Sequence, residues 1–375
     1  MPNFYSLIRP VLRRLPAEAA RDLTVRALQL GLGRFMVEGV SEELDPPILM
    51  QRLWGLDFPN PVGLAAGYDK DGCVAEAMRR FGFGFVEIGT VTPRPQAGNQ
   101  KPRVFRLEED QAIVNRMGFN SGGLDVVIDG LSRRSRSGVI GVNLGKNRDT
   151  RDAAADYAEG IHRTGRLADY LVVNISSPNT PGLRELQHRA NLESLLHRLI
   201  QARKQSGCQV PLLVKIAPDL TPAEREDIAS VALDARIDGL VVSNTTVARP
   251  VGLVSRNAKE MGGLSGRPLF APSTALLADM YRLTQGRVPL IGVGGIANAT
   301  NAYAKIRAGA SLVQLYSALV FAGPRLVNEI TKGLAGLLSA DGFTSVADAV
   351  GTGWESATAP ATGVNKAAIQ VETRS

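Results

Sequence analysis

The sequence predicts a (β/α)8, or TIM, barrel that carries an N-terminal amphipathic two-helix extension. Eight apolar runs recur along the 375 residues, and each run is almost continuously hydrophobic. This pattern is typical of parallel strands that are buried on both faces. Segments with apolar residues three or four positions apart separate the runs, and many begin with Asp, Pro or Asn. Eight strand-helix units over about 280 residues indicate a TIM barrel.

The predicted strands are residues 61–67, 85–91, 139–146, 170–177, 211–218, 239–246, 289–296 and 312–320. The predicted helices between them are residues 71–81, 152–167, 192–205, 222–236, 272–284, 298–308 and 324–338. Two insertions, 92–120 and 249–270, follow the second and the sixth strand. Because TIM barrels build their sites at the carboxyl ends of the strands, both insertions are expected to form the catalytic face. The barrel is expected to span 45–340, between an N-terminal segment, 1–40, and a partly disordered tail, 341–375.

The N-terminal segment combines apolar residues with a concentration of positive charge. Residues 1–34 hold six Arg against Glu18 and Asp22, so this segment carries +4 of the chain's net charge of +7. Apolar residues recur between the Arg residues, which predicts two basic amphipathic helices. The pattern fits both packing on the barrel wall and binding at a membrane interface. No run of 18 apolar residues and no signal-peptide core is present.

Cysteine and histidine are too few to support disulfide or zinc chemistry. The chain has two Cys, Cys73 and Cys208, without a paired spacing, and three His in segments that are predicted as helix or surface loop. Neither a disulfide framework nor a metal site is therefore expected.

The loop from Asn174 to Gly182 is the most informative segment. It places Ser177 and the carboxamides of Asn174 and Asn179 where a buried strand gives way to a loop broken by Pro and Gly, the position from which α/β enzymes present catalytic groups. The first downstream His is His188 and none lies within ten residues upstream, so a Ser-His hydrolase fits poorly. We predict that Ser177 accepts a proton beside amides that hold a planar, polar substrate. The alternative is a turn that merely ends a strand.

Other strand ends predict an anionic ligand. Lys215 interrupts an apolar run, and because a lone buried cation is costly, it should face an anion such as a reduced flavin or a carboxylate. Gly292–Ile296 and the pair Tyr316–Ser317 end the seventh and eighth strands, where TIM barrels commonly bind phosphate. A phosphate-bearing ligand is therefore expected.

Several long motifs closely resemble those of class 2, quinone-dependent dihydroorotate dehydrogenases, and they follow the family's order over about residues 45–340. The motifs are LAAGYDKDG at 64–72, EIGTVTPRP at 87–95, NRMGFN at 115–120, NISSPNTPG at 174–182, KIAPD at 215–219, GGLSGRP at 262–268 and IGVGGI at 291–296. The bacterial, membrane-associated form is the most similar, since no mitochondrial targeting segment precedes the predicted helices.

The resemblance implies that dihydroorotate is oxidised to orotate in UMP biosynthesis, with FMN as hydride acceptor and ubiquinone or menaquinone as final electron acceptor. Ser177 would remove the C5 proton while a hydride leaves C6, and Lys215 would stabilise the anionic reduced flavin. One FMN per chain would be bound by Ala66, Gly67, Tyr68, Asp69, Lys70, Thr90, Asn143, Asn174, Lys215, Ser243, Gly266, Gly295, Tyr316 and Ser317. Dihydroorotate would be bound by Lys70, Asn115, Arg116, Met117, Gly118, Phe119, Asn174, Asn179, Asn244 and Thr245.

The resemblance also gives the N-terminal helices a role. They would bind the cytoplasmic side of the inner membrane peripherally and form the mouth of a quinone tunnel, with Arg103 and Tyr316 at its inner end.

Three residues depart from the family's pattern. Ser243 stands where Thr is expected, Tyr68 replaces Leu or Phe, and Arg21 stands near a His of some relatives, so no quinone role is carried to it.

Two other classes remain as alternatives. A flavin barrel of the tRNA-dihydrouridine synthase kind would suit the basic charge, but such enzymes use a catalytic Cys in the active-site loop and a separate basic domain. A non-catalytic phosphate-binding scaffold would leave Lys70 and Lys215 without a task. No nucleic-acid partner is therefore expected.

Overall fold

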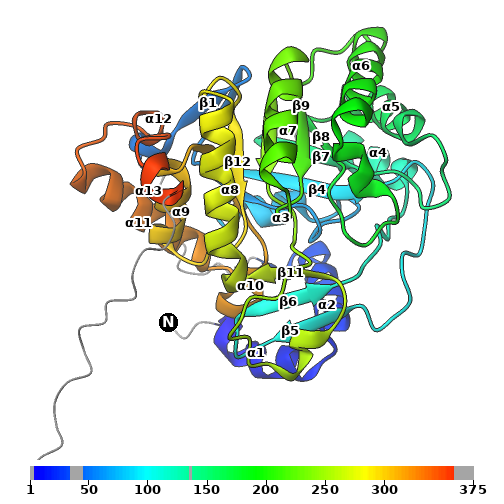
Figure 1. Ribbon diagram of the computed structural model, residues 1–375. Helices are drawn as coiled ribbons and strands as arrows, with labels where there is room; N and C mark the ends of the chain where they lie inside the picture. Colours follow the sequence, from blue (N-terminus) through cyan, green and yellow to red (C-terminus); the bar gives the residue numbers. More distant parts are fainter. Residues whose placement is uncertain (1–3, 34–44, 135–136, 359–375) are drawn as a thin grey trace, which may run out of the picture.

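The chain folds as a closed barrel of eight parallel strands surrounded by helices (Figure 1). The computed structural model describes residues 4–33, 45–134 and 137–358. Neighbouring barrel strands follow one another in the sequence, and the eight predicted strands are confirmed as the barrel strands. These are β3 (Val62–Leu64), β4 (Phe85–Val91), β7 (Val139–Leu144), β8 (Tyr170–Asn174), β9 (Leu212–Ile216), β10 (Gly239–Val242), β12 (Leu290–Val293) and β13 (Ala310–Leu315).

Helices cover the outside of the barrel, and the seven predicted ones are present with shifted ends. The helices that follow successive strands are α3 (Ala75–Arg79), α4 (Leu124–Ser132), α5 (Ala153–Thr164), α6 (Arg189–Gln205), α7 (Pro222–Asp234), α8 (Phe270–Leu283), α9 (Ala299–Arg307) and α11 (Leu326–Ala340). The last strand was predicted to reach residue 320, but β13 ends at Leu315 and the residues from Ser317 form the short helix α10 (Ser317–Ala322). Further short helices are η2 (Pro47–Leu49), η3 (Leu183–Gln187), η4 (Arg256–Lys259) and η5 (Arg267–Leu269).

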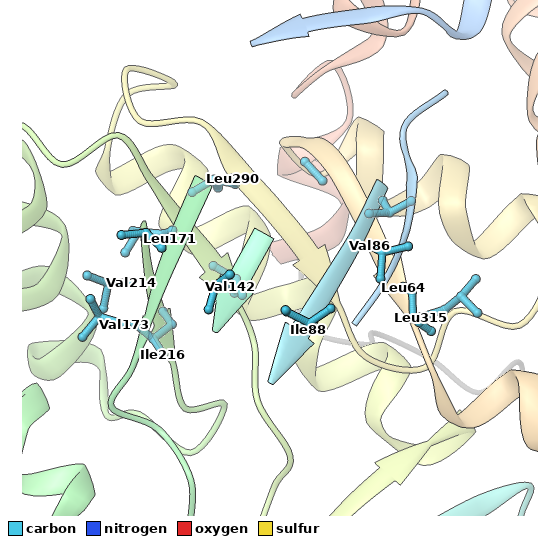
Figure 2. Packing of buried hydrophobic residues seen from close by; sticks show 14 of the residues in the cluster. Leu64, Val86, Ile88, Val142, Leu171, Val173, Val214, Ile216, Leu290 and Leu315 are labelled. Atoms are coloured by element: carbon cyan, nitrogen blue, oxygen red, sulfur yellow. The ribbon is translucent and has the colours of Figure 1, made fainter. Parts of the chain in front are cut away.

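Alternate residues of each strand face the helices and the barrel interior. The outward set forms one apolar layer with the helices, in which Leu171 and Val173 of β8 pack near Val214 and Ile216 of β9 (Figure 2). The inward set forms a second cluster, which includes the ring of Tyr170 and is separate from the first. This two-sided burial explains why the strands read as continuous apolar runs.

A short hairpin that the sequence did not predict closes the amino-terminal end of the barrel. It consists of β1 (Gln51–Leu53) and β2 (Leu56–Phe58), which pair antiparallel. The ring of Phe58 packs edge-on against Phe85 at 5.4 Å between centroids, and Trp54 lies 6.0 Å from Tyr170. The barrel interior is therefore filled by aromatic rings at this end and is open for a ligand only at the other.

The two insertions meet at the carboxyl end of the barrel. Residues of the first form β5 (Val104–Leu107) and β6 (Ala112–Asn115), and residues of the second form β11 (Gly263–Gly266). These strands make one antiparallel sheet in the order β11-β6-β5. Both insertions thus build one cover over the carboxyl ends of the strands, as was expected of their position.

The N-terminal extension is a pair of helices, α1 (Phe4–Arg14) and α2 (Ala17–Gln29), which lies beside β5 and β6 (Figure 1). Arg103 donates to the Glu18 carboxylate of α2 at 2.7 Å, and Arg106 donates to the carbonyl of Leu12 at 3.2 Å. Val25 and Leu28 are buried in the outer apolar layer. The helices are therefore attached to the cover as well as to the barrel. None of the helices described is both long and apolar enough to cross a bilayer.

The chain continues as packed structure beyond residue 340, where the sequence placed the start of a partly disordered tail. Residues 341–358 contain α12 (Val346–Ala349) and α13 (Trp354–Thr358), and α13 packs against α8. The side chain of Val346 is fully buried. Residues 341–358 thus extend the packed structure past the predicted boundary at 340, because apolar residues after it contribute to the outer layer. Residues 359–375 lie outside the described part of the chain.

Candidate active site

A cavity of about 410 Å³ lies at the carboxyl ends of the barrel strands, beneath the β11-β6-β5 sheet. Most of the residues predicted for cofactor and substrate line it. They are Ala66, Gly67, Lys70, Thr90, Asn115, Met117, Gly118, Phe119, Asn174, Ser177, Asn179, Lys215, Ser243, Asn244, Thr245, Gly266, Gly295, Tyr316 and Ser317. The structure thus gathers residues from the carboxyl ends of every barrel strand except β7, and from both insertions, around one space.

Four predicted site residues do not line this cavity. Tyr68 faces a second cavity, and the Asp69 carboxylate accepts the backbone N–H groups of Cys73 and Val74, which orders the following turn. Asn143 lies behind the lining in a hydrogen-bond network. The Arg116 guanidinium instead pairs with Glu260 at 2.7 Å, outside the cavity.

A network of side-chain hydrogen bonds fixes the amides on one wall. Thr90 Oγ1 donates to Asn143 Oδ1 at 2.6 Å, and Asn174 Nδ2 donates to the same oxygen at 3.1 Å. Asn244 Nδ2 in turn donates to Asn174 Oδ1 at 3.2 Å. Since each amide is held by the next, their donors and acceptors are oriented before a ligand binds.

Lys215 is buried in the barrel and meets an acidic residue of the chain itself. Its Nζ lies 3.9 Å from Glu87 Oε1, and their side chains are 6% and 0% exposed. Burial lowers the pKa of Lys215, and the negative charge of Glu87 opposes that shift. Glu87 also accepts from Asn143 at 2.8 Å and from Gln314 at 2.7 Å. The sequence argument sought the partner of Lys215 in a ligand and missed Glu87, although a charge within a strand as apolar as β4 is itself a signal.

Ser177 lies at the cavity wall on the loop that follows β8. Its side chain is buried, and its Oγ accepts the backbone N–H of Asn179 at 3.2 Å. The Asn179 side chain donates to the backbone carbonyl of Asn115 at 3.1 Å, which ties the loop to the cover. No histidine is among the described residues that line the cavity. The arrangement therefore offers a hydroxyl without an imidazole base, which agrees with the exclusion of a Ser-His hydrolase.

Lys70 is a second buried lysine of the cavity. Burial lowers its pKa to about 7, and the nearby positive charges of Arg21 and Arg103 contribute to the lowering, against the opposing effect of Asp71 and Glu18. An amine with such a pKa changes its charge near neutral pH and would gain a proton when an anion binds beside it.

A glycine turn follows β12 at one end of the cavity. Gly294 and Gly295 have φ values of 115° and 74°, which side chains rarely adopt, and a Cβ on Gly295 would lie 2.5 Å from the backbone N of Phe270. The hydroxyls of Ser265 and Ser317 are 2.8 Å apart beside this turn. Ser265, Arg267 and Gln111 also line the cavity and were not predicted, because the insertions gave no strand periodicity to place them.

A second cavity of about 140 Å³ lies between the N-terminal helices and the barrel. Its lining includes Leu12, Arg21 and Leu28 from the helices, together with Tyr68. Tyr316 lines both cavities, and its ring packs edge-on against that of Tyr68 at 5.6 Å. Arg103 does not line this cavity, whereas its ion-pair partner Glu18 does. The two cavities are therefore neighbours across a shared wall.

The fold and the cavity define a TIM-barrel protein with a small-ligand site of amides, hydroxyls and two buried lysines. Residues 48–338 match the family of dihydroorotate dehydrogenases, and the chain belongs to that family. It is 55% identical to a dihydroorotate dehydrogenase (quinone) of Xanthobacter autotrophicus, over 93% of this chain and 99% of that protein. It is 51% identical to the mitochondrial dihydroorotate dehydrogenase (quinone) of Mus musculus, over 93% of this chain and 90% of that one. A crystal structure of the Eimeria tenella enzyme in complex with ferulenol is similar, with a TM-score of 0.82 and 45% identity over 89% of this chain and 95% of that one.

Proposed function

We propose that this protein is a quinone-dependent dihydroorotate dehydrogenase, which oxidises dihydroorotate to orotate in pyrimidine biosynthesis. Family membership gives the reaction, and relatives at 51–56% identity carry the same name over nearly their full length. The observation that carries the proposal is the single cavity in which Ser177, the asparagines and the two lysines meet. A dihydropyrimidine presents hydrogen-bond donors and acceptors in pairs, which carboxamides match.

The cavity fits FMN as the bound cofactor. The side-chain oxygen of Gln314 is buried and has no hydrogen-bond partner, although Gln314 lines the cavity, so it would accept from a ligand N–H group. The turn at Gly294 and Gly295 and the hydroxyl of Ser317 would hold the phosphate. FMN, when bound, would supply the acceptor for a hydride from the substrate. The proposed cofactor residues are Ala66, Gly67, Lys70, Thr90, Asn174, Lys215, Ser243, Gly266, Gly295, Tyr316 and Ser317, with Tyr68, Asp69 and Asn143 supporting them from behind.

Ser177 is the proposed proton acceptor of the reaction. Its Oγ is held by the N–H of Asn179, so the oxygen has a fixed place at the cavity wall. A neutral hydroxyl is a weak base, and the reaction is therefore expected to speed up with rising pH. The proposed substrate residues are Lys70, Asn115, Met117, Gly118, Phe119, Asn174, Asn179, Asn244 and Thr245, with Arg116 positioning the segment from outside.

Lys215 is proposed to provide positive charge at the cofactor. The Glu87 carboxylate, 3.9 Å from Lys215 Nζ, favours the charged form of this lysine against the opposing effect of burial. Negative charge that develops in the cavity would then be stabilised by a cation that is already in place and needs no reorganisation.

The second cavity is the proposed quinone site, and the helix pair is its proposed contact with the membrane. Large apolar residues are exposed on the helices and at the end of α2, with exposures of 59% for Val11, 49% for Leu23 and 77% for Leu30, which follows the last residue of α2. Exposed apolar residues beside Arg side chains favour an anionic lipid surface. We infer a peripheral location at the cytoplasmic side of the inner membrane, with ubiquinone or menaquinone entering between the helices.

A visible spectrum of the purified protein tests the proposal. A yellow protein that dihydroorotate bleaches anaerobically, and that a quinone then reoxidises, is the expected result. A yellow protein that ignores dihydroorotate would favour an RNA-directed flavin enzyme, and a colourless protein that gains no colour with added FMN would favour a scaffold. Turnover assays with ubiquinone and menaquinone identify the acceptor.

A further inference from the structure

Lys305 of α9 is a buried lysine that the proposed reaction does not use. Its side chain is fully buried, and burial alone lowers its pKa well below the usual value of a lysine. Its Nζ donates to Ser273 Oγ at 2.6 Å and lies 5.5 Å from the centroid of the Phe270 ring. No carboxylate among the described residues forms a salt bridge with it. A buried amine with one hydroxyl as partner is costly to keep, which calls for a reason specific to this place.

Ser273 connects Lys305 to the glycine turn of the first cavity. Its Oγ lies 2.7 Å from the carbonyl oxygen of Leu269 and 3.2 Å from those of Phe270 and Gly294. A Cβ on Gly294 would come within 2.7 Å of the same Oγ. Because Ser273 accepts from the Lys305 amine, its single proton is directed to one of these carbonyls. The amine, the hydroxyl and the glycine turn therefore form one packed stack behind the cavity wall.

The cavity side of this stack is where the cofactor phosphate is proposed to bind. Gly295 packs so closely on the first turn of α8 that no side chain fits between them, so the position of the turn depends on the residues behind it. We propose that Lys305 is a positioning residue that acts through Ser273 to hold the Gly294–Gly295 turn ready for phosphate. This inference rests on the proposed binding of FMN.

Comparing FMN with riboflavin, which lacks the phosphate, tests this role. The full-length protein is freed of flavin, and the dissociation constants of both ligands are measured by fluorescence quenching. Lys305→Met, which keeps the length of the side chain but removes the amine, is expected to weaken FMN about tenfold and riboflavin less than about twofold, since the hydrogen bond to Ser273 is lost. Lys332→Met on the exposed face of the adjacent α11 is the matched control and should change neither constant.

Ser273→Ala tests whether Lys305 acts through the hydroxyl. Ser273→Ala should weaken the binding of FMN more than that of riboflavin. The double variant Lys305→Met/Ser273→Ala should bind FMN about as tightly as whichever single variant binds it less tightly. Equal losses of FMN and riboflavin affinity, or unchanged FMN affinity, would overturn the role of Lys305. Should Lys305→Met fail to fold, Ser273→Ala decides by the same comparison. A wild-type protein that binds riboflavin as tightly as FMN would instead contradict the proposed phosphate site itself.

Discussion

Breaking the Lys215–Glu87 pair should destabilise the barrel in a way that depends on which partner is removed. Taking one member from a buried ion pair typically costs about 3–5 kcal/mol. Lys215→Met leaves the Glu87 carboxylate with the Asn143 and Gln314 amides and with the Tyr170 hydroxyl, which donates at 3.3 Å. Because these donors still compensate the charge, we expect a loss of unfolding free energy near the low end, about 3 kcal/mol.

Glu87→Gln should cost more at neutral pH, because it removes the only interaction that raises the pKa of Lys215. The unfolded chain keeps its lysine protons up to about the ordinary lysine pKa of 10.5, whereas the folded protein releases the Lys215 proton at a lower pH. The unfolded state thus binds more protons, so stability rises with pH in this window. The deficit of Glu87→Gln is therefore expected to shrink as the pH rises from neutral toward the ordinary lysine pKa of 10.5.

Urea unfolding of the cofactor-free protein, followed by circular dichroism, measures these losses. The double variant Lys215→Met/Glu87→Gln should lose clearly less than the sum of the single variants. Arg52→Ala is the control, since its ion pair with Asp57 is 71% and 64% exposed and should contribute at most about 1 kcal/mol. The coupling would be refuted if each single variant lost less than about 1 kcal/mol of unfolding free energy and the double variant lost the sum of the two.

Three further predictions concern the reaction and the membrane. Ser177→Ala should retain FMN but slow its reduction by dihydroorotate at least ~10²-fold in stopped flow, and wild-type speed would exclude Ser177 as proton acceptor. Orotate affinity should fall as the pH rises through about 7, because Lys70, whose pKa is about 7, then loses the charge that attracts a carboxylate; Lys70→Met should give a flatter profile in the same titration. Leu30→Asp should weaken flotation with anionic vesicles without slowing flavin reduction by dihydroorotate, and unchanged flotation would remove α2 from the proposed membrane contact.

The barrel could be predicted from the sequence because each strand is buried on both faces and is followed by an amphipathic helix. The hairpin β1–β2 was missed because its strands have three residues each, too few for any periodicity. The β11-β6-β5 sheet was missed for a different reason. Its strands come from insertions that are about 150 residues apart, and pairing over such a distance leaves no local pattern.

The site was predicted where a polar residue ends a strand, as with Ser177 and Asn244. Residues in the middle of strands were missed, although Glu87 and Gln314 point into the barrel and hydrogen-bond to each other. Their signal was available, because a charged or amide residue inside an apolar run needs a partner. Lys215 and Glu87 are each a charge inside an apolar strand, so the two are natural partners within the barrel.

The N-terminal helices are also expected to affect the proposed substrate site through charge. Arg21 of α2 donates to the carbonyl of Tyr68 at 2.7 Å and lowers the pKa of Lys70, whereas Glu18 raises it to a smaller extent. Deleting residues 1–33 removes Arg21, Glu18 and part of the burial of Lys70. Burial and Arg21 lower the pKa of Lys70 by more than Glu18 raises it. The pKa of Lys70 should therefore rise, and the loss of orotate affinity should move to higher pH in the truncated enzyme. A profile that stays at the wild-type pH would show that the helices do not tune the charge of Lys70.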